Sequence, residues 1–294
     1  MSAFCDLHFH STYSEGARSP SDVVKRALRY DIGALSLTDH NDITGTQEMR
    51  AACAAAGIAC ISGVELYVTI ESKECHLLGY GYAESDAGLI KALEELRRIH
   101  LSNITSSLRV MHKAGFEVDP EFYKHIHSRY PGFSHMVSHL MQSPANVERF
   151  QKELAPTAPS LFSIIDRYFA RDCIAFLPQS SLPIRDAVSL ITKAGGVAVL
   201  AHPGQQLLMG TDDHIVLSAK KAGIRGIELI SPYHTWHHVE YYQNFALRHG
   251  LFMTGGSDYH TDINFTGRES VAHQWQIQRT PYSFYTQLHG ILEA

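Results

Sequence analysis

The chain has 294 residues, of which 45% are hydrophobic, and its formal net charge is -5. This length and composition predict a folded, soluble protein with one full-sized core and room for a small insertion. The negative charge argues against a broad basic surface for duplex DNA, and no stretch approaches the roughly 20 apolar residues of a membrane span, so we expect neither partner.

The cysteines and the first residues bear on the compartment. Five cysteines form an odd set without CxxC spacing, which argues against both a disulfide framework and a zinc-thiolate site. The opening MSAFCDLHFH has neither the basic nor the apolar region of a secretory signal. We therefore expect a cytoplasmic protein with reduced thiols.

Short apolar runs rich in β-branched residues alternate with helical patterns, which predicts an α/β barrel with a mainly parallel sheet. A helix is expected over residues 20–31, because Ser19 can cap it, Pro20 fits its first position and Asp22 completes a pattern like a capping box. The expected strands, in chain order, are 5–8, 34–38, 59–66, 76–80, 197–201, 226–230 and 251–255.

The β/α rhythm fails between residues 86 and 186, where the pattern becomes long and helical with breaks near Pro120, Pro131, Pro144 and Pro156. We expect a barrel formed by residues 1–85 and 187–294, with residues 86–186 inserted as a mainly helical cap. Insertions after barrel strands lie over the catalytic face, so this cap is expected to select the substrate.

The first two strands end in polar side chains. In Asp6-Leu7-His8-Phe9-His10, a period of two puts His8 and His10 on one face of the strand, where two imidazoles can hold one ion. Glu15 follows in the turn after this strand, and the second strand ends at Asp39-His40. The carboxyl ends of barrel strands are where catalytic residues gather.

The later strands repeat this arrangement. Glu65 follows an apolar run, where an unpaired buried carboxylate is costly and a pair of metal ions would neutralise it. His76 opens the next strand, His202 closes 197–201, and Asp258-Tyr259-His260 repeats the period of two. A single such histidine is more often a packing residue, but five strand ends with the same feature indicate a metal site.

The motifs HFHSTYSEG, LTDHND, GVE, HLLGY, AHPG and GSDYH together resemble those of the PHP (polymerase and histidinol phosphatase) superfamily. The resemblance implies a distorted seven-stranded β/α barrel with a trinuclear metal centre. It places His8, His10, Glu65 and Asp258 on the first metal, and Glu65, His76 and His202 on the second. Glu15, His40 and His260 would hold the third, with Glu15 standing where near relatives usually have Asp.

Nitrogen and oxygen ligands without thiolates suit two or three ions of Mn or Fe, with Zn or Mg as the other metals that such a set accepts. The implied mechanism is attack by a metal-bound hydroxide held by Glu65, His202 and Asp258, with phosphate as a product. Asp39 is expected to support a neighbouring ligand through a hydrogen bond.

The insertion and the AHPG motif resemble the branch of nucleoside 3',5'-bisphosphate phosphatases and 5'-to-3' exoribonucleases. That branch usually reads S/T-R-x-H-F-A-R-H-L in the cap, whereas this chain has Phe133 and Ser138 at the two arginine positions and keeps His135. The lysine of a second stretch, G-K-x-G-Y-V, is also missing from 172–177. His135, Arg129 and Arg171 are the candidate substrate contacts, and the loss of basic groups favours a substrate with one anionic group.

These observations predict a metal-dependent hydrolase of a small phosphate ester, with a nucleotide or a short oligonucleotide end as the expected substrate. Three alternatives stay open at this point. One is a phosphatase for histidinol phosphate or another small metabolite, and another is a PHP domain that no longer catalyses and serves as an interaction module. Hydrolysis of a C–N bond is disfavoured, because no metal-bridging lysine is evident on a strand.

Overall fold

The computed structural model of the chain describes residues 3–260, 275 and 279–294. The strands are β1 (Phe4–Phe9), β2 (Ile32–Leu37), β3 (Ala59–Cys60), β4 (Gly63–Ile70), β5 (Lys73–Tyr80), β6 (Leu182–Pro183), β7 (Val197–Leu200), β8 (Gly226–Ile230), β9 (Phe252–Gly255) and β10 (Thr280–Pro281). The helices of the barrel region are α1 (Pro20–Ala27), α2 (Thr46–Ala56), α7 (Ile184–Lys193), α8 (Pro203–Gln206), α9 (Asp213–Ala222), α10 (Trp236–His249) and α12 (Tyr282–Leu292).

The predicted α/β class is confirmed, and the strands form two sheets. One has the order β10-β1-β2-β3, and the other has the order β6-β4-β5-β7-β8-β9. Single bridges between Phe9 and Tyr259 and between His40 and Glu65 connect the sheets where their strands end. These two bridges gather the carboxyl ends of β1, β2 and β9 around β4.

The predicted strand 59–66 is wrong, because the structure divides it between the two sheets. β3 ends at Cys60 and pairs with β2, whereas β4 begins at Gly63 and pairs with β5. A Cβ on residue 63 would lie 2.7 Å from the carbonyl oxygen of Leu37, at the end of β2. The chain therefore needs a glycine where it passes β2 on its way into the second sheet. β4 is buried, and the flanking Ile58 and Ile61 are buried beside the half-buried β3, so a continuous apolar run hides the break. The pairing of β4 with β5 is antiparallel, unlike the parallel pairing of β7, β8 and β9.

The predicted helix 20–31 starts as expected and ends earlier. Ser19 is its N-cap and accepts a hydrogen bond from the amide of Asp22, with Pro20 in the first turn. The α-helix ends at Ala27, a 3-10 turn η1 (Leu28–Tyr30) follows, and Asp31 adopts the left-handed conformation at φ 59°. That conformation stops the helix.

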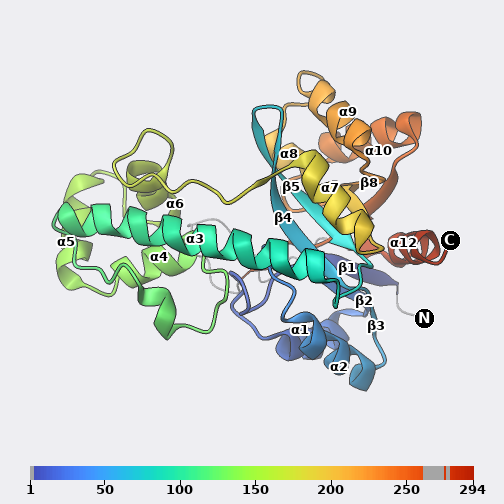
Figure 1. Ribbon diagram of the computed structural model, residues 1–294, viewed down its shortest axis with the longest axis horizontal. Helices are drawn as coiled ribbons and strands as arrows, with labels where there is room; N and C mark the ends of the chain where they lie inside the picture. The colour runs from blue at the N-terminus through green and yellow to red at the C-terminus, as the bar shows by residue number, and fades with distance from the viewer. Residues whose placement is uncertain (1–2, 261–274, 276–278) are drawn as a thin grey trace.

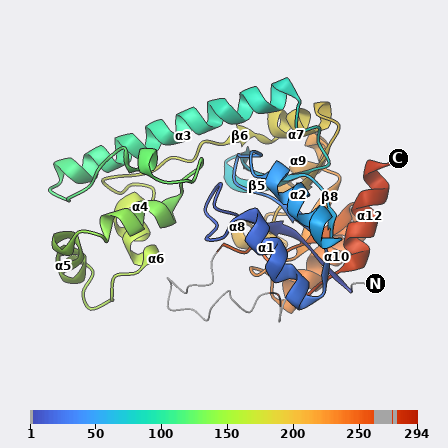
Figure 2. The same ribbon diagram turned by 90° about the horizontal axis from the view of Figure 1, so that it is seen from below.

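The region expected to form the cap is helical. It contains α3 (Ala87–Lys113), α4 (Phe133–Leu140), α5 (Pro144–Glu153), α6 (Leu161–Ile164), the 3-10 turn η2 (Phe122–His125) and the π-helical turn η3 (Ile165–Phe169). Figure 1 shows α3 running from the barrel to a lobe that holds α4, α5 and α6, and Figure 2 shows the same lobe beside the barrel. Ile104, Met136, Phe150 and Tyr168 belong to a hydrophobic cluster inside this lobe. The bounds at residues 86 and 186 stay a prediction.

The barrel helices bury the outer faces of both sheets. Leu66, Leu77 and Ile227 pack with helices α7, α9 and α10 in the largest hydrophobic cluster. The packed sheets thus form a rigid support for the side chains at the strand ends.

Within the described residues, no helix has the length and apolar character that a membrane crossing requires.

Candidate metal centre

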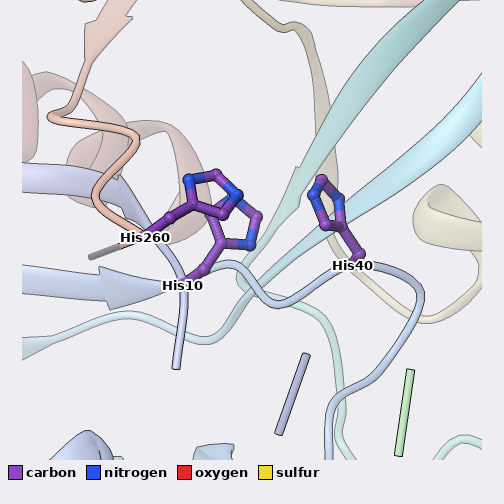
Figure 3. A group of neighbouring side chains, drawn as sticks. All are labelled: His10, His40 and His260. Atoms are coloured by element: carbon purple, nitrogen blue, oxygen red, sulfur yellow. The ribbon is translucent and has the colours of Figure 1, made fainter. Parts of the chain in front are cut away.

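Eight of the nine predicted ligands lie together at the strand ends, in three of the four groups of donor atoms that each fit within 4.8 Å; the fourth group joins His8, His202 and Glu228. The first group contains His8, His10, Glu65 and Asp258. The second contains Glu65, His76 and His202. The third contains His10, His40 and His260, whose rings Figure 3 shows facing a shared space.

The loop after β9 reaches this centre through close backbone contact with β1. The amide of Asp258 donates to the carbonyl of His8 at 2.7 Å. A Cβ on Gly256 would lie 2.3 Å from the backbone nitrogen of His8, so only glycine allows this approach. Asp258 itself has φ 46°, a left-handed conformation that is strained for a residue other than glycine and that recurs at functional sites.

Glu65 lies at the centre of the cluster and is almost completely buried, with 1% of its side chain exposed. The distances from its Oε2 are 3.3 Å to His8 Nε2, 3.2 Å to His10 Nε2 and 3.0 Å to His40 Nδ1. Its Oε1 lies 2.9 Å from both His76 Nδ1 and His202 Nε2. One carboxylate therefore faces all three donor groups.

The charges within the cluster are unevenly distributed. Burial alone would lower the pKa of His10, but the neighbouring carboxylates of Asp258 and Glu65 raise it to about 9. Burial and the neighbouring His10 lower the pKa of His40 to about 3 and that of His260 to about 4. His40 and His260 are thus held as neutral imidazoles, which is the form that binds metal.

Polar atoms without hydrogen-bond partners in the described structure show that this cluster fits metal ions. His8 Nε2, His40 Nδ1 and Glu65 Oε2 are buried and lack such a partner. A buried polar atom without a partner is costly, and these three point into the donor groups. Imidazole and carboxylate donors without thiolates suit first-row divalent ions.

A second ring of carboxylates holds the donors in place. Glu228 Oε1 lies 3.0 Å from His8 Nδ1, and its Oε2 accepts from the amide of His202 at 2.7 Å. This contact turns His8 Nε2 toward the cluster. The predicted supporting residue Asp39 accepts hydrogen bonds from the hydroxyls of Ser11 and Ser14 at 2.7 and 2.5 Å, and it fixes the loop after β1 rather than a ligand directly.

Sequence reasoning missed Glu228 and Tyr67. Glu228 is a fully buried carboxylate inside the apolar strand GIELI, and that contrast was the available signal. The ring of Tyr67 stacks on His40 with centroids 4.8 Å apart, and it lies two residues after Glu65 on the same face of β4. Tyr233 packs edge-on against His202 with ring centroids 5.2 Å apart, and the nearby charge of Asp258 raises the pKa of its phenol well above the usual range.

Glu15 is the one predicted ligand outside the three donor groups. Its carboxylate accepts from the hydroxyl of Ser134 at 3.2 Å, on the first turn of α4. Burial raises the pKa of Glu15 to about 7, although His10 and Ser134 oppose that shift. Its role as a ligand stays a prediction.

The candidate substrate contacts lie at different places. His135 is on α4, and its Nδ1 lies 3.3 Å from the amide nitrogen of Gly132. Arg129 Nε pairs with the buried carboxylate of Asp42 at 3.0 Å, and its guanidinium also pairs with Glu94. Arg171 is exposed. The structure therefore brings His135 close to Glu15 through α4, whereas the guanidinium of Arg129 pairs with two carboxylates.

Comparison with known proteins gives one family and several relatives. The PHP domain family matches residues 6–178. A 3',5'-nucleoside bisphosphate phosphatase from Chromobacterium violaceum is 31% identical over 269 residues, which cover 87% of this chain and 86% of that protein. A phosphoribosyl 1,2-cyclic phosphate 1,2-diphosphodiesterase from Eggerthella lenta is 30% identical over 260 residues, which cover 87% of this chain and 93% of that protein.

A solved structure agrees with these relatives. The structure of an amidohydrolase from Chromobacterium violaceum, with bound sulfate and no metal, has a TM-score of 0.76 and 26% sequence identity. The match covers 98% of this chain and 96% of that one. The resemblance drawn from the motifs, including its bisphosphate phosphatase branch, is confirmed.

Proposed function

The chain belongs to the PHP domain family, and on that premise we propose that it hydrolyses a small phosphate ester at the centre around Glu65. The observation that carries the proposal is the set of donor groups that share this one buried carboxylate. A bisphosphate phosphatase and a cyclic phosphate diesterase are among its relatives, so a nucleotide-like substrate agrees best with the comparisons.

The proposed ligands follow from the three donor groups. His8, His10, Glu65 and Asp258 would hold one ion, Glu65, His76 and His202 a second, and His40 and His260 a third, with Glu15 as its further predicted ligand. When bound, divalent ions would neutralise phosphate oxygens and lower the pKa of a coordinated water. We expect Mn or Fe in these positions, as the donor types allow.

The protein's own residues position these groups. Glu65 uses both oxygens, so it aligns the donor groups relative to one another. Glu228 fixes the ring of His8, and Asp39 holds the loop that carries Ser11 and Ser14. Tyr233 packs edge-on against His202, which restricts the movement of that ring.

The cap would bind the part of the substrate away from the reacting phosphate. His135 on α4 is the proposed contact, since its helix meets Glu15 at the edge of the centre. Phe133 and Ser138 supply no charge where the resembling branch has arginine. We therefore infer a phosphoester with a single anionic group, in a cytoplasmic setting.

Two other enzymatic functions differ from the proposed one in the residues that they would require. A phosphatase for small metabolites would use the same centre and differ only in the cap contacts. Hydrolysis of a C–N bond with a bridging lysine is disfavoured, because Lys73 is the only lysine on a described strand and it pairs with Asp212 at 3.2 Å.

Phosphate release by the Mn-loaded protein tests the proposal. The panel contains mononucleotides, nucleoside 3',5'-bisphosphates, 5'-phosphorylated short oligonucleotides, a cyclic phosphate diester and histidinol phosphate. We expect release from mononucleotides, and we expect His10→Ala to lower it by more than the roughly 10- to 100-fold that loss of an outer-shell partner costs. His112→Ala, at an exposed position of α3, is the matched control.

Three outcomes of this assay decide between the alternatives. Release from histidinol phosphate alone would favour the small-metabolite phosphatase. Full activity of His10→Ala would contradict a reaction at this centre. Bound Mn without release from any ester would contradict the proposed hydrolysis and favour a non-catalytic module.

A further inference from the structure

Tyr233 lies at the edge of the metal centre and is accessible from solvent. It belongs to the turn 231–235, which joins the end of β8 to α10, and 38% of its surface is exposed. By contrast, His202 has no exposed surface and Asp258 has 6%. Tyr233 is therefore a side chain that contacts a proposed ligand and that a substrate can also reach.

The ring of Tyr233 lies against the second donor group, and its hydroxyl lies beside the first. The ring packs edge-on against His202, with ring centroids 5.2 Å apart. The charge of Asp258 raises the pKa of the phenol most strongly, and the charge of Glu65 adds to this effect. Because Glu65 belongs to both donor groups, the hydroxyl lies beside the space that these two groups share.

The turn that carries Tyr233 is fixed to the short helix α8. His234 Nδ1 lies 2.8 Å from the carbonyl oxygen of Leu229, and His234 Nε2 lies 3.0 Å from the amide nitrogen of Gly204. Nδ1 must therefore carry the ring proton, while Nε2 accepts from the amide. Since Gly204 comes two residues after His202, this imidazole holds the turn of Tyr233 and the loop of His202 in a fixed relation.

A phosphate ester bound at the centre would need a hydrogen-bond donor beside the metal ligands. An ester that bridges the first and second donor groups would place two oxygens on the ions and leave a further oxygen free. The guanidinium of Arg129 pairs with Asp42 and Glu94, so it does not supply this donor. A phenol has one proton to donate and keeps it below about pH 10. The hydroxyl of Tyr233 meets both requirements, position and chemistry.

We propose that Tyr233 is a catalytic residue whose hydroxyl donates a hydrogen bond to a phosphoryl oxygen of the ester held at the first and second donor groups. This inference rests on the proposed function and adds a substrate contact from the barrel to the one proposed in the cap. Hydrogen bonds to charged groups are strong, so loss of this one should lower phosphate affinity about 10- to 100-fold.

Binding of inorganic phosphate to the Mn-loaded protein tests the contact. Tyr233→Phe keeps the ring against His202 and removes only the hydroxyl. Tyr285→Phe, on α12, is the matched control, because that ring packs with Tyr282 and His289. Mn in the centre broadens the phosphorus NMR line of phosphate that binds beside it, so the titration reports this site. We expect Tyr233→Phe to bind phosphate about 10- to 100-fold more weakly than the wild type and the control, with bound Mn and unfolding temperature unchanged.

Steady-state kinetics measure the same contact during hydrolysis. For an ester that the wild type hydrolyses, we expect Tyr233→Phe to lower kcat/KM about 10- to 100-fold and Tyr285→Phe to leave it unchanged. Weaker phosphate binding with an unchanged kcat/KM would overturn the catalytic role of Tyr233.

The remaining results separate this proposal from the proposed function. An unchanged phosphate affinity in Tyr233→Phe would overturn the hydrogen bond even where the wild type hydrolyses esters, and so would a wild type that binds no phosphate. A loss of bound Mn in Tyr233→Phe would also overturn it, because the hydroxyl would then support the ligands and not the phosphate. If phosphate affinity falls as expected while the wild type releases no phosphate from any ester, the contact stands and the proposed hydrolysis fails.

Discussion

At the scale of single residues, the centre depends on buried carboxylates that meet histidines. Glu65 contacts the donors, and Glu228 lies behind them with no exposed surface. Burial would raise the pKa of Glu65, but His8, His76 and His40 hold it well below its usual range. Glu65 is therefore ionised. A bound cation would add positive charge to that which these histidines already place beside its carboxylate.

Replacement of Glu228 tests how far the outer carboxylate tunes the donors. Glu228→Gln removes the charge behind His8 and weakens the acceptor for the amide of His202. We expect a 10- to 100-fold loss of Mn affinity, on the order that loss of an outer partner costs. Competition with a metal chelator measures this affinity. Glu240→Gln, exposed on α10, should leave it unchanged, and equal affinities of both variants with the wild type would contradict the role of Glu228.

Most of the donors could be predicted from the sequence, because polar residues stand where apolar strands end. Eight of the nine predicted ligands meet in the structure. Glu228 was not predicted as part of the centre, because it lies inside a strand, where periodicity predicts a packing residue. The direction in which the Glu15 side chain points could not be predicted either, because its contact with Ser134 joins residues that are 119 positions apart.

At the scale of elements, two stacked rings within the proposed cap and one hydrogen bond connect α3 and the segment after η2 to the loop after β2. His100 on α3 stacks on Tyr130 with centroids 3.9 Å apart, and the hydroxyl of Tyr130 accepts from Asn41, next to His40. His100 Nε2 lies 2.7 Å from the carbonyl of Pro131, so this nitrogen carries the proton. The cap is thereby linked to the residue beside a proposed ligand.

His100 should make the protein sensitive to acid. Burial lowers its pKa to about 4, against the opposing hydrogen bond to Pro131. Because the unfolded chain takes up this proton at higher pH, stability is present above about pH 6.5 and falls as the pH approaches 4. Between pH 7 and 4.5 the free energy of unfolding should fall by about 2–3 kcal/mol more in the wild type than in His100→Gln. Urea unfolding at both pH values measures this difference, and parallel losses would contradict it.

Arg129 should act on stability rather than on substrate binding. Its guanidinium pairs with Asp42, which is 5% exposed, so Arg129→Met leaves a buried carboxylate with one partner fewer. We expect a loss of about 1–3 kcal/mol in the free energy of unfolding, with an unchanged KM for the phosphate ester. Arg98→Met breaks an exposed pair with Glu95 and should leave the free energy of unfolding almost unchanged. A raised KM in Arg129→Met at unchanged stability would instead assign Arg129 to the substrate.

The order of helices and strands could be predicted from the sequence, but strand pairing could not in full. Hydrophobic runs show where β4 and β5 lie, yet only the turn at Glu71, with φ 56°, makes them an antiparallel hairpin. The short edge strands β6 and β10 have two residues each, too few for a periodic signal.

At the scale of the whole molecule, bound metal should join the two sheets. The donors come from β1, β4 and β5 and from the ends of β2, β7 and β9, which belong to both sheets. The family resemblance predicted this convergence from ordered motifs. It could not predict how the lobe around α4 packs, because helical periodicity gives an apolar face and not its partner.

Metal removal should lower the thermal stability of the chain. A ligand that binds only the folded state adds about 2.7 kcal/mol at 100 times its Kd. We therefore expect Mn to raise the unfolding temperature of chelator-treated protein by several degrees, and we expect Asp258→Asn to reduce that rise. Differential scanning calorimetry measures both. An unfolding temperature that does not respond to Mn would mean that the cluster forms no metal site.

The most direct test of the central claim is an anomalous difference map from crystals grown with Mn. We expect peaks between His8, His10, Glu65 and Asp258, between Glu65, His76 and His202, and beside His40 and His260. Ordered side chains at these positions with no peak among them, in crystals that carry Mn elsewhere, would contradict a metal centre around Glu65.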